Sequence, residues 1–241
     1  MKNIKKLPQI VSLLSLLIVF TPANAGVKVV TSIKPIHSLA SYLMDGVGKP
    51  DLIVDGYASP HGFALKPSHA KMIQNADLIF WVGEDLENFL EKPLKSIAKK
   101  AEKIELMEIK GLKKLEFRER NIFEGHDDHK DHGHKEDKHD DHKDHGHKED
   151  KHDDHHENAH GEHDPHIWLD PMNAKVMLSE MAEHLIEKDQ ENASKYKANL
   201  KNAHKDLDKL TKKVKSELNK DFKSIVFHDA YQYFEKRFNV N

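Results

Sequence analysis

Residues 27–57 read VKVVTSIKPIHSLASYLMDGVGKPDLIVDGY, and this stretch decides the fold class. The β-branched run 27–33 predicts a buried strand. A helix is expected from Pro35, a favourable first helical residue, to Met44. The run 51–57 then predicts a second strand. Strand, helix and strand in this order form the repeating unit of a parallel sheet.

The same alternation continues after this unit. We expect a short helix over 68–75, a strand over 77–82, a helix over 84–100 and a shorter strand over 102–109. Strands that alternate with amphipathic helices are typical of α/β proteins in which helices cover a parallel sheet. We assign residues 26–125 to one α/β lobe, which residues 164–190 complete.

Two further helices are expected in the second half of the chain. The first runs from Pro171 to Lys188, and the second ends near Asn219. The longer helix is amphipathic, because its apolar residues are spaced by three and four. Its roughly 28 residues would span about 42 Å. That length suits a strut between two lobes, to which we assign residues 191–220, although a long helix on one globular domain has the same periodicity.

Few residues follow the long helix. Residues 223–227 (KSIVF) predict a strand, and an aromatic-rich helix is expected over 230–238. Roughly twenty residues are too few for a domain, which usually has about 100. Residues 221–241 therefore either pack onto the first lobe or begin a second, incomplete lobe. We favour the second alternative and expect the sequence to be a fragment or a truncated product.

The N-terminus has the features of an export signal. Lys2, Lys5 and Lys6 precede an apolar run, and Ala23-Asn24-Ala25 is a small-x-small cleavage site. The run is too short to span a bilayer comfortably. We therefore expect residues 1–25 to be a cleavable signal peptide and the protein to work in a bacterial periplasm. The chain has no cysteine, which excludes disulfides and thiolate metal sites.

Residues 126–163 form a tract in which thirteen of thirty-eight residues are histidine. A thirteen-residue unit occurs in it twice, at 129–141 and 142–154. The tract has no Leu, Ile, Val, Phe, Tyr or Trp, so we expect it to be disordered without a ligand. Its histidines beside carboxylates predict weak metal sites. We favour a low-affinity zinc reservoir, with zinc sensing or solubility as other roles.

The charge of the chain is uneven. With histidine neutral, the tract carries −8 and the remaining residues carry +5, for a net charge of −3. Neither part shows the dense basic face of a nucleic-acid binder, so no nucleic-acid partner is expected.

Seven histidines lie outside the tract. We expect a hydrogen-bonded structural role for His37 inside the first helix and an exposed or capping role for His69. His184 and His204 fall within helices among polar neighbours, which indicates surface residues.

His61, His166 and His228 differ, because each lies in a loop or at the end of an element. Parallel α/β sheets bind ligands outside the carboxyl ends of their strands. Three imidazoles that converge on a point suit Zn²⁺, with Zn–N bonds of about 2.0–2.1 Å. Their spacing along the chain does not by itself establish that they converge.

Three motifs carry a resemblance to a known family: SPHGFALKPSH (59–69), DPHIWLDP (164–171) and VFHDAYQYF (226–234). With the signal peptide and the tract, they resemble the ZnuA family, the periplasmic zinc-binding receptors of zinc-uptake ABC transporters. The resemblance extends from about Val27 to Asn241. It implies two α/β lobes joined by one long helix, with the metal in the cleft between them. It also implies ligand roles for His61, His166 and His228, and a membrane permease and its ATPase as partners.

Two departures from the family pattern concern the ligands. Some members have a carboxylate before the first ligand histidine, where this chain has Pro60. Manganese- and iron-binding relatives take a fourth, carboxylate ligand from late in the second lobe, and this chain ends before it. Imidazole suits zinc, copper, nickel and iron, whereas carboxylate suits manganese. Three histidines therefore favour zinc, and affinity should fall as the pH drops below about 6.5.

Three other functions stay open. A zinc hydrolase also uses three protein ligands and one open position. The one HExxH match, HENAH at 156–160, lies in the tract, where no helix is predicted, and no general base is evident beside a candidate ligand, so we expect no enzyme. A zinc buffer or metallochaperone would act through the tract alone. A manganese or iron receptor would share the architecture. We expect a monomer.

Overall fold

The computed structural model describes residues 26–118, 162–219, 225–226 and 228–240. The expected signal peptide and all but the last two residues of the histidine-rich tract lie outside these ranges. Within them, no helix is both long enough and apolar enough to cross a bilayer.

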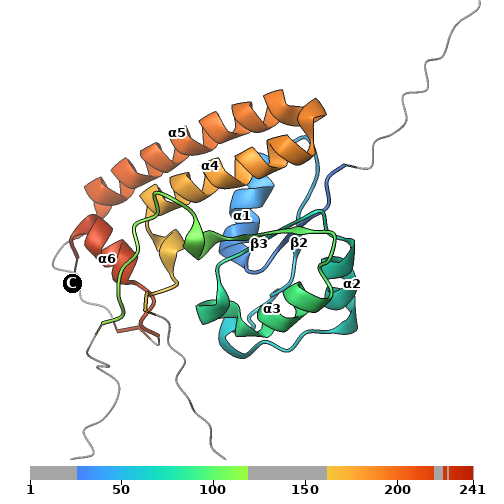
Figure 1. Cartoon of the computed structure of the whole chain (residues 1–241). Helices are drawn as coiled ribbons and strands as arrows, with labels where there is room; N and C mark the ends of the chain where they lie inside the picture. The colour runs from blue at the N-terminus through green and yellow to red at the C-terminus, as the bar shows by residue number, and fades with distance from the viewer. Residues whose placement is uncertain (1–25, 119–161, 220–224, 227, 241) are drawn as a thin grey trace, which may run out of the picture.

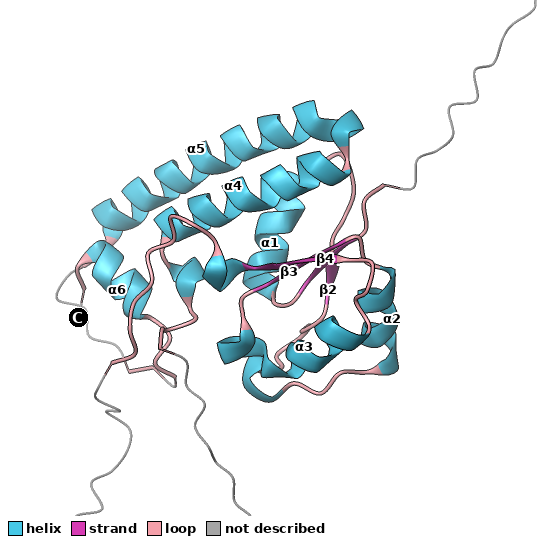
Figure 2. Cartoon of the chain, in the orientation of Figure 1, coloured by secondary structure: helices cyan, strands magenta, loops and turns pink. Residues whose placement is uncertain are grey.

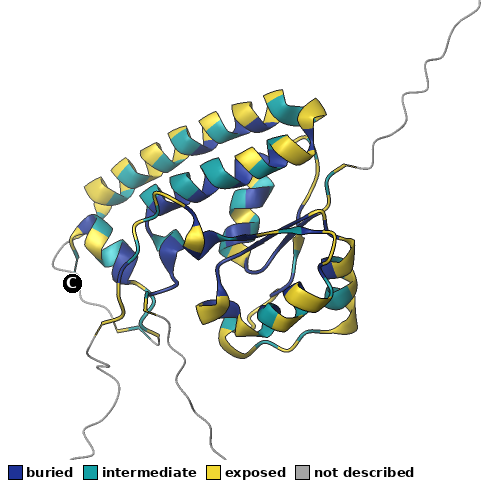
Figure 3. Cartoon of the chain, in the orientation of Figure 1, coloured by how far each residue is buried: buried dark blue, intermediate teal, exposed yellow. Residues whose placement is uncertain are grey.

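A four-stranded parallel sheet forms the centre of the fold (Figure 2). Its strands are β1 (Val29–Thr31), β2 (Asp51–Leu52), β3 (Leu78–Trp81) and β4 (Glu102–Glu105), in the order β2-β1-β3-β4. Every residue of β1 and β3 is buried, as expected for strands covered on both faces (Figure 3). The predicted parallel α/β sheet is therefore confirmed.

The two outer strands are shorter than the sequence predicts. The β2 ladder stops at Leu52, and the chain turns at Gly56, whose φ of 73° favours glycine. The β4 strand gives way to a 3₁₀ turn, η2 (Leu106–Glu108). Apolar periodicity located both strands but not their ends, which depend on these turns.

Helices cover both faces of the sheet (Figure 1). One face carries α1 (Lys34–Leu43) and α4 (Pro171–Lys188), and α5 (Ala193–Glu217) lies outside them. The opposite face carries α2 (Pro67–Asn75) and α3 (Glu84–Ser96). The predicted bounds of α4 are confirmed, because Asp170 caps its first turn and Pro171 opens it.

The long helix α5 packs beside α4 and α1 for part of its length. Its buried residues, Tyr196, Asn199 and Ala203, lie in its N-terminal half. Leu210, further along, is half exposed. The expected role of this helix as a strut between two lobes stays a prediction.

The last helix, α6 (Gln232–Phe238), packs onto the lobe that the sheet organises. Tyr233 and Phe238 are buried there, and the guanidinium of Arg237 donates two hydrogen bonds of 2.6 Å to buried Asp170. The strand expected at 223–227 falls mostly outside the described residues. Its two described members, Ile225 and Val226, lie in no strand, and Ile225 is fully exposed.

Candidate metal centre

Three different elements bring His61, His166 and His228 together. His61 lies in the 3₁₀ turn η1 (Pro60–Gly62), which follows β2 and is capped by Ser59. His166 immediately precedes η3 (Ile167–Leu169), and His228 lies just before α6. The ligand nitrogens of all three lie within 4.8 Å of one another.

The rings themselves are close. Their centroids are 6.0 Å apart for His61 and His166, 5.1 Å for His61 and His228, and 5.0 Å for His166 and His228. The Nε2 atoms of His166 and His228 lie 3.2 Å apart. Two nitrogens bound to one tetrahedral Zn²⁺ at about 2.0–2.1 Å would be about 3.3 Å apart. This pair therefore already has the spacing of two ligands on one zinc ion.

A hollow of about 500 Å³ opens at the three histidines. Its wall is mainly apolar and includes Ile33, Val54 and Trp168. No aspartate or glutamate is among the described residues that line it. A donor set of imidazoles without carboxylates suits zinc better than manganese or magnesium.

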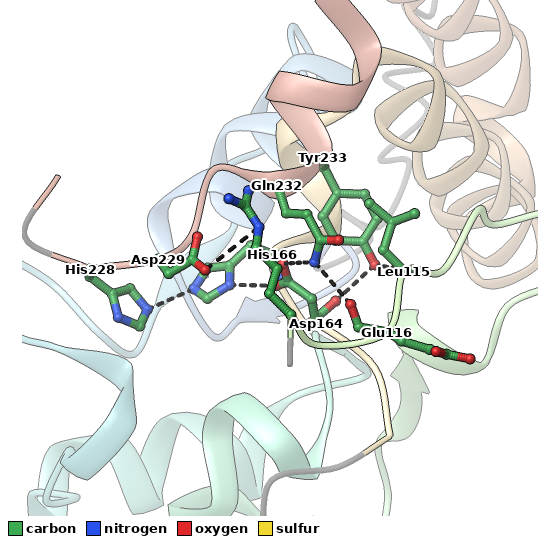
Figure 4. Close-up of polar contacts among 9 residues, drawn as sticks. Leu115, Glu116, Asp164, His166, His228, Asp229, Gln232 and Tyr233 are labelled. Carbon is green, nitrogen blue, oxygen red and sulfur yellow. Dashed lines mark hydrogen bonds and ion pairs between the residues drawn. The ribbon is translucent and has the colours of Figure 1, made fainter. Parts of the chain in front are cut away.

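The three histidines differ in burial and in support. His166 is 6% exposed, and its Nδ1 lies 2.7 Å from Oδ1 of buried Asp164 (Figure 4). His61 and His228 are exposed. His228 is exposed as a whole, but partial burial of its ring, and secondarily the charge of a protonated His166, lowers its pKa. A lowered pKa favours the neutral imidazole, which is the form that binds metal.

Two histidines outside the cluster have the roles that the sequence predicts. The His37 ring lies 3.1 Å from the carbonyl oxygen of Pro50, a structural hydrogen bond. His69 forms a capping box at the start of α2, where its Nδ1 accepts from the Lys66 amide.

His184 and His204 lie partly exposed at the surface, but each has a partner that the sequence analysis did not predict. Both are half-buried: His204 contacts the Lys175 carbonyl oxygen at 3.1 Å, and His184 pairs with Glu102 at 2.7 Å. Helical periodicity did not reveal these partners, because each belongs to another element than its histidine: Lys175 to α4 and Glu102 to β4.

Glu102, His184 and Glu187 form a second cluster with metal-ligand spacing. Lys188 Nζ lies 2.9 Å from Glu102 Oε2 and already supplies a cation there. We therefore interpret this cluster as an ion-pair network that joins α4 to β4.

Sequence reasoning gave little weight to one residue of the centre, Asp164. Its oxygen Oδ1 accepts hydrogen bonds from both the backbone amide and the ring Nδ1 of His166. The signal was present in the sequence, because an aspartate two residues before a histidine can reach both groups through an Asx turn.

The fold and the three histidines define an α/β protein with a candidate metal centre at the carboxyl edge of its parallel sheet. The family described as "ZnuA: Zinc-uptake complex component A periplasmic" matches residues 29–241, and the chain belongs to this family. The resemblance found in the sequence motifs is thereby confirmed.

Several curated relatives are named high-affinity zinc uptake system protein ZnuA. The one from Brucella abortus strain 2308 is 50% identical over 220 residues, which are 88% of this chain and 65% of the relative. The one from Yersinia pestis is 35% identical over 234 residues, covering 95% of this chain and 69% of the relative. The chain thus spans about two thirds of the length of these relatives.

Solved structures share the fold. A zinc-bound deletion mutant of ZnuA has a TM-score of 0.64 and 22% identity, over 89% of this chain and 68% of that one. Zn(II)-bound AdcA from Streptococcus pneumoniae has a TM-score of 0.63 and 18% identity, over 89% and 38%.

Proposed function

We propose that this chain is a periplasmic receptor that binds Zn²⁺ through His61, His166 and His228 and delivers it to an ABC importer. The observation that carries the proposal is the convergence of three imidazoles on one point, with two Nε2 atoms 3.2 Å apart. Relatives named as high-affinity zinc uptake proteins support zinc as the cargo. A membrane permease and its ATPase would be the partners.

The geometry suits a cargo site. Three neutral nitrogens leave one position of a tetrahedral zinc ion open for water or for a further protein ligand. His61 and His228 are exposed and lie on separate loops, so they can part from the metal without disturbing the sheet. The buried His166 would keep its place during capture and release.

A zinc titration against a chromophoric chelator tests the proposal. The chelator is chosen to outcompete weak sites, so the histidine-rich tract does not contribute to the signal. Wild type should show one tight equivalent, and the variant His61→Ala/His166→Ala/His228→Ala should show none. The matched control, His184→Ala/His204→Ala, should keep it. Tight binding by the triple variant would favour a zinc buffer that acts through the tract.

We propose a separate, low-affinity reservoir role for residues 126–163. A flexible chain loses entropy when it orders around an ion, so its sites should be weaker than a preformed one. Deletion of the tract should remove the weak equivalents and leave the tight one. Loss of the tight equivalent on deletion would contradict this role.

Competition experiments separate the proposal from its alternatives. Zinc should displace manganese and iron(II) at fixed pH, because no carboxylate lines the described wall of the hollow. The zinc-loaded protein should not hydrolyse ester or peptide substrates. Turnover that the His166→Ala change abolishes would instead indicate a zinc hydrolase.

A further inference from the structure

Asp164 occupies a fully hydrogen-bonded position beside the metal centre (Figure 4). Its backbone amide donates to the Leu115 carbonyl oxygen at 2.8 Å, and its own carbonyl oxygen accepts from the Tyr233 hydroxyl at 2.8 Å. Its Oδ1 accepts from the backbone amide of His166 at 2.9 Å and lies 2.7 Å from the ring Nδ1. Its Oδ2 accepts from the Gln232 amide at 3.2 Å.

We propose that Asp164 and Gln232 form a positioning pair that fixes the tautomer and the orientation of His166. The effect of this pair on zinc affinity rests on the proposed function. A carboxylate beside Nδ1 keeps the ring proton on that nitrogen and leaves the lone pair on Nε2. Nε2 is the atom that faces His228, so the ring presents its ligand nitrogen to the centre before a metal arrives.

Gln232 holds the carboxylate from the opposite side. Its side-chain amide nitrogen donates one hydrogen to Asp164 Oδ2 and the other to the Glu116 carbonyl oxygen, at 3.0 Å. The residue is 5% exposed, and it lies at the start of α6. With Oδ1 bound to His166 and Oδ2 bound to Gln232, rotation of the carboxylate would break hydrogen bonds in a buried environment, which is costly.

The pair links α6 to the buried histidine ligand. Tyr233 extends this link, because its hydroxyl donates to the Asp164 carbonyl oxygen and accepts from the Leu115 amide at 3.0 Å. A displacement of α6 would therefore reach the His166 ring through two hydrogen-bonded side chains. Partners of this kind, outside the metal's own ligands, typically contribute about 10–100-fold to metal affinity.

The change Asp164→Ala tests the tautomer directly. Alanine removes the oxygen that accepts from both the amide and the ring of His166, so nothing holds the ring proton on Nδ1 and it can move to Nε2, the wrong nitrogen for binding. Long-range ¹H–¹⁵N spectra of the metal-free protein report this proton, and a His166→Gln spectrum assigns the signal. We expect the Nδ1–H form in wild type, a shift toward the Nε2–H form in Asp164→Ala, and a loss of zinc affinity of about 10–100-fold.

The change Gln232→Leu tests the second member without altering charge. It should keep the Nδ1–H form but loosen the carboxylate, with a loss of zinc affinity of about 3–10-fold, smaller than for Asp164→Ala. Asn173→Leu is the matched control, because buried Asn173 also exchanges two hydrogen bonds with this segment, at Lys113, without touching Asp164. It should lower thermal stability to a similar extent and leave zinc affinity within about twofold of wild type.

Three results would overturn the positioning role. The first is an Nδ1–H tautomer as populated in Asp164→Ala as in wild type. The second is zinc binding by Gln232→Leu that matches the Asn173→Leu control, and the third is a wild-type His166 that carries its proton on Nε2. If wild type bound no tight zinc, the proposed function would fail, and the metal-free spectra would still decide the positioning role.

Discussion

Glu87 gives the protein a pH-dependent stability that one substitution should remove. The residue lies in the first turn of α3 with 0% exposure, and its Oε2 accepts from the amides of Val82 at 2.9 Å and Gly83 at 3.0 Å. Its Oε1 has no well-aligned hydrogen bond within the described residues. Burial raises the pKa of Glu87 to about 7, although these amides and the Ser32 hydroxyl partly offset the rise.

The sign of the effect follows from the two pKa values. Below about pH 4.5, the ordinary value, Glu87 is protonated in both the folded and the unfolded chain, and burial carries no charge penalty. Between about pH 4.5 and 7 the unfolded chain loses its proton first, so the free energy of unfolding falls as pH rises. A pKa raised from 4.5 to about 7 corresponds to roughly 3 kcal/mol, fully lost above pH 7.

The variant Glu87→Gln keeps the shape of the side chain and removes its titration. Its carbonyl oxygen can still accept from Val82 and Gly83, and its NH₂ group can face Ser32. The variant should match wild type near pH 4.5 and exceed its free energy of unfolding by about 3 kcal/mol at pH 8.

Urea unfolding followed by tryptophan fluorescence at pH 4.5, 6 and 8, with chelator present, measures the difference. Other titrating groups, including those of the histidine-rich tract, are common to both proteins and cancel. Asp85→Asn, at an exposed position in the first turn of the same helix, is the control. Parallel pH curves for wild type and Glu87→Gln would refute the reasoning.

Three further predictions concern packing around the lobe. Arg237→Leu leaves the buried Asp170 carboxylate without its two 2.6 Å hydrogen bonds from the guanidinium. The free energy of unfolding should fall by about 2–3 kcal/mol, which is less than for a fully buried pair because the arginine is partly exposed. No change in thermal unfolding would contradict this prediction. Asn199→Leu removes the hydrogen bonds that join α5 to the carbonyl oxygens of Leu43 and Asp45. Urea unfolding should show a loss of about 1–3 kcal/mol in the free energy of unfolding. An unchanged midpoint would mean that water replaces these hydrogen bonds. Tyr57→Ser, at a fully exposed side chain whose ring centroid lies 5.7 Å from Lys34 Nζ, should change stability by less than about 1 kcal/mol in the same assay. A larger loss would mean that Tyr57 contributes more than an exposed cation–π contact.

Much of the fold could be predicted because it depends on local patterns. The apolar runs around Val30 and Ile79 are buried on both faces of the sheet, and such runs are what periodicity detects best. The position of α6 could not be predicted in this way. It depends on Arg237 pairing with Asp170 and on Tyr233 reaching residue 115, contacts between segments far apart in the sequence.

The candidate site could likewise be predicted only in part. The rule that ligands gather at the carboxyl edge of a parallel sheet singled out His61, His166 and His228 from the other histidines outside the tract, and the resemblance gave them a common role. Their separation along the chain carries no information about a 3.2 Å contact between two of their nitrogens. That contact depends on how η3 and the start of α6 are held, which only the folded structure shows.

In the proposed function, the unequal burial of the three ligands has a consequence for the release of cargo. A rigid set of three histidines would bind tightly but would give up the metal slowly, because affinity differences appear mainly in the dissociation rate. Here one ligand is buried, while the other two are exposed on separate segments. A fixed His166 lowers the entropy lost on binding, and departure of His61 or His228 alone would weaken the site enough for release. In the proposed function, tight capture and timely delivery therefore depend on different residues of the same centre.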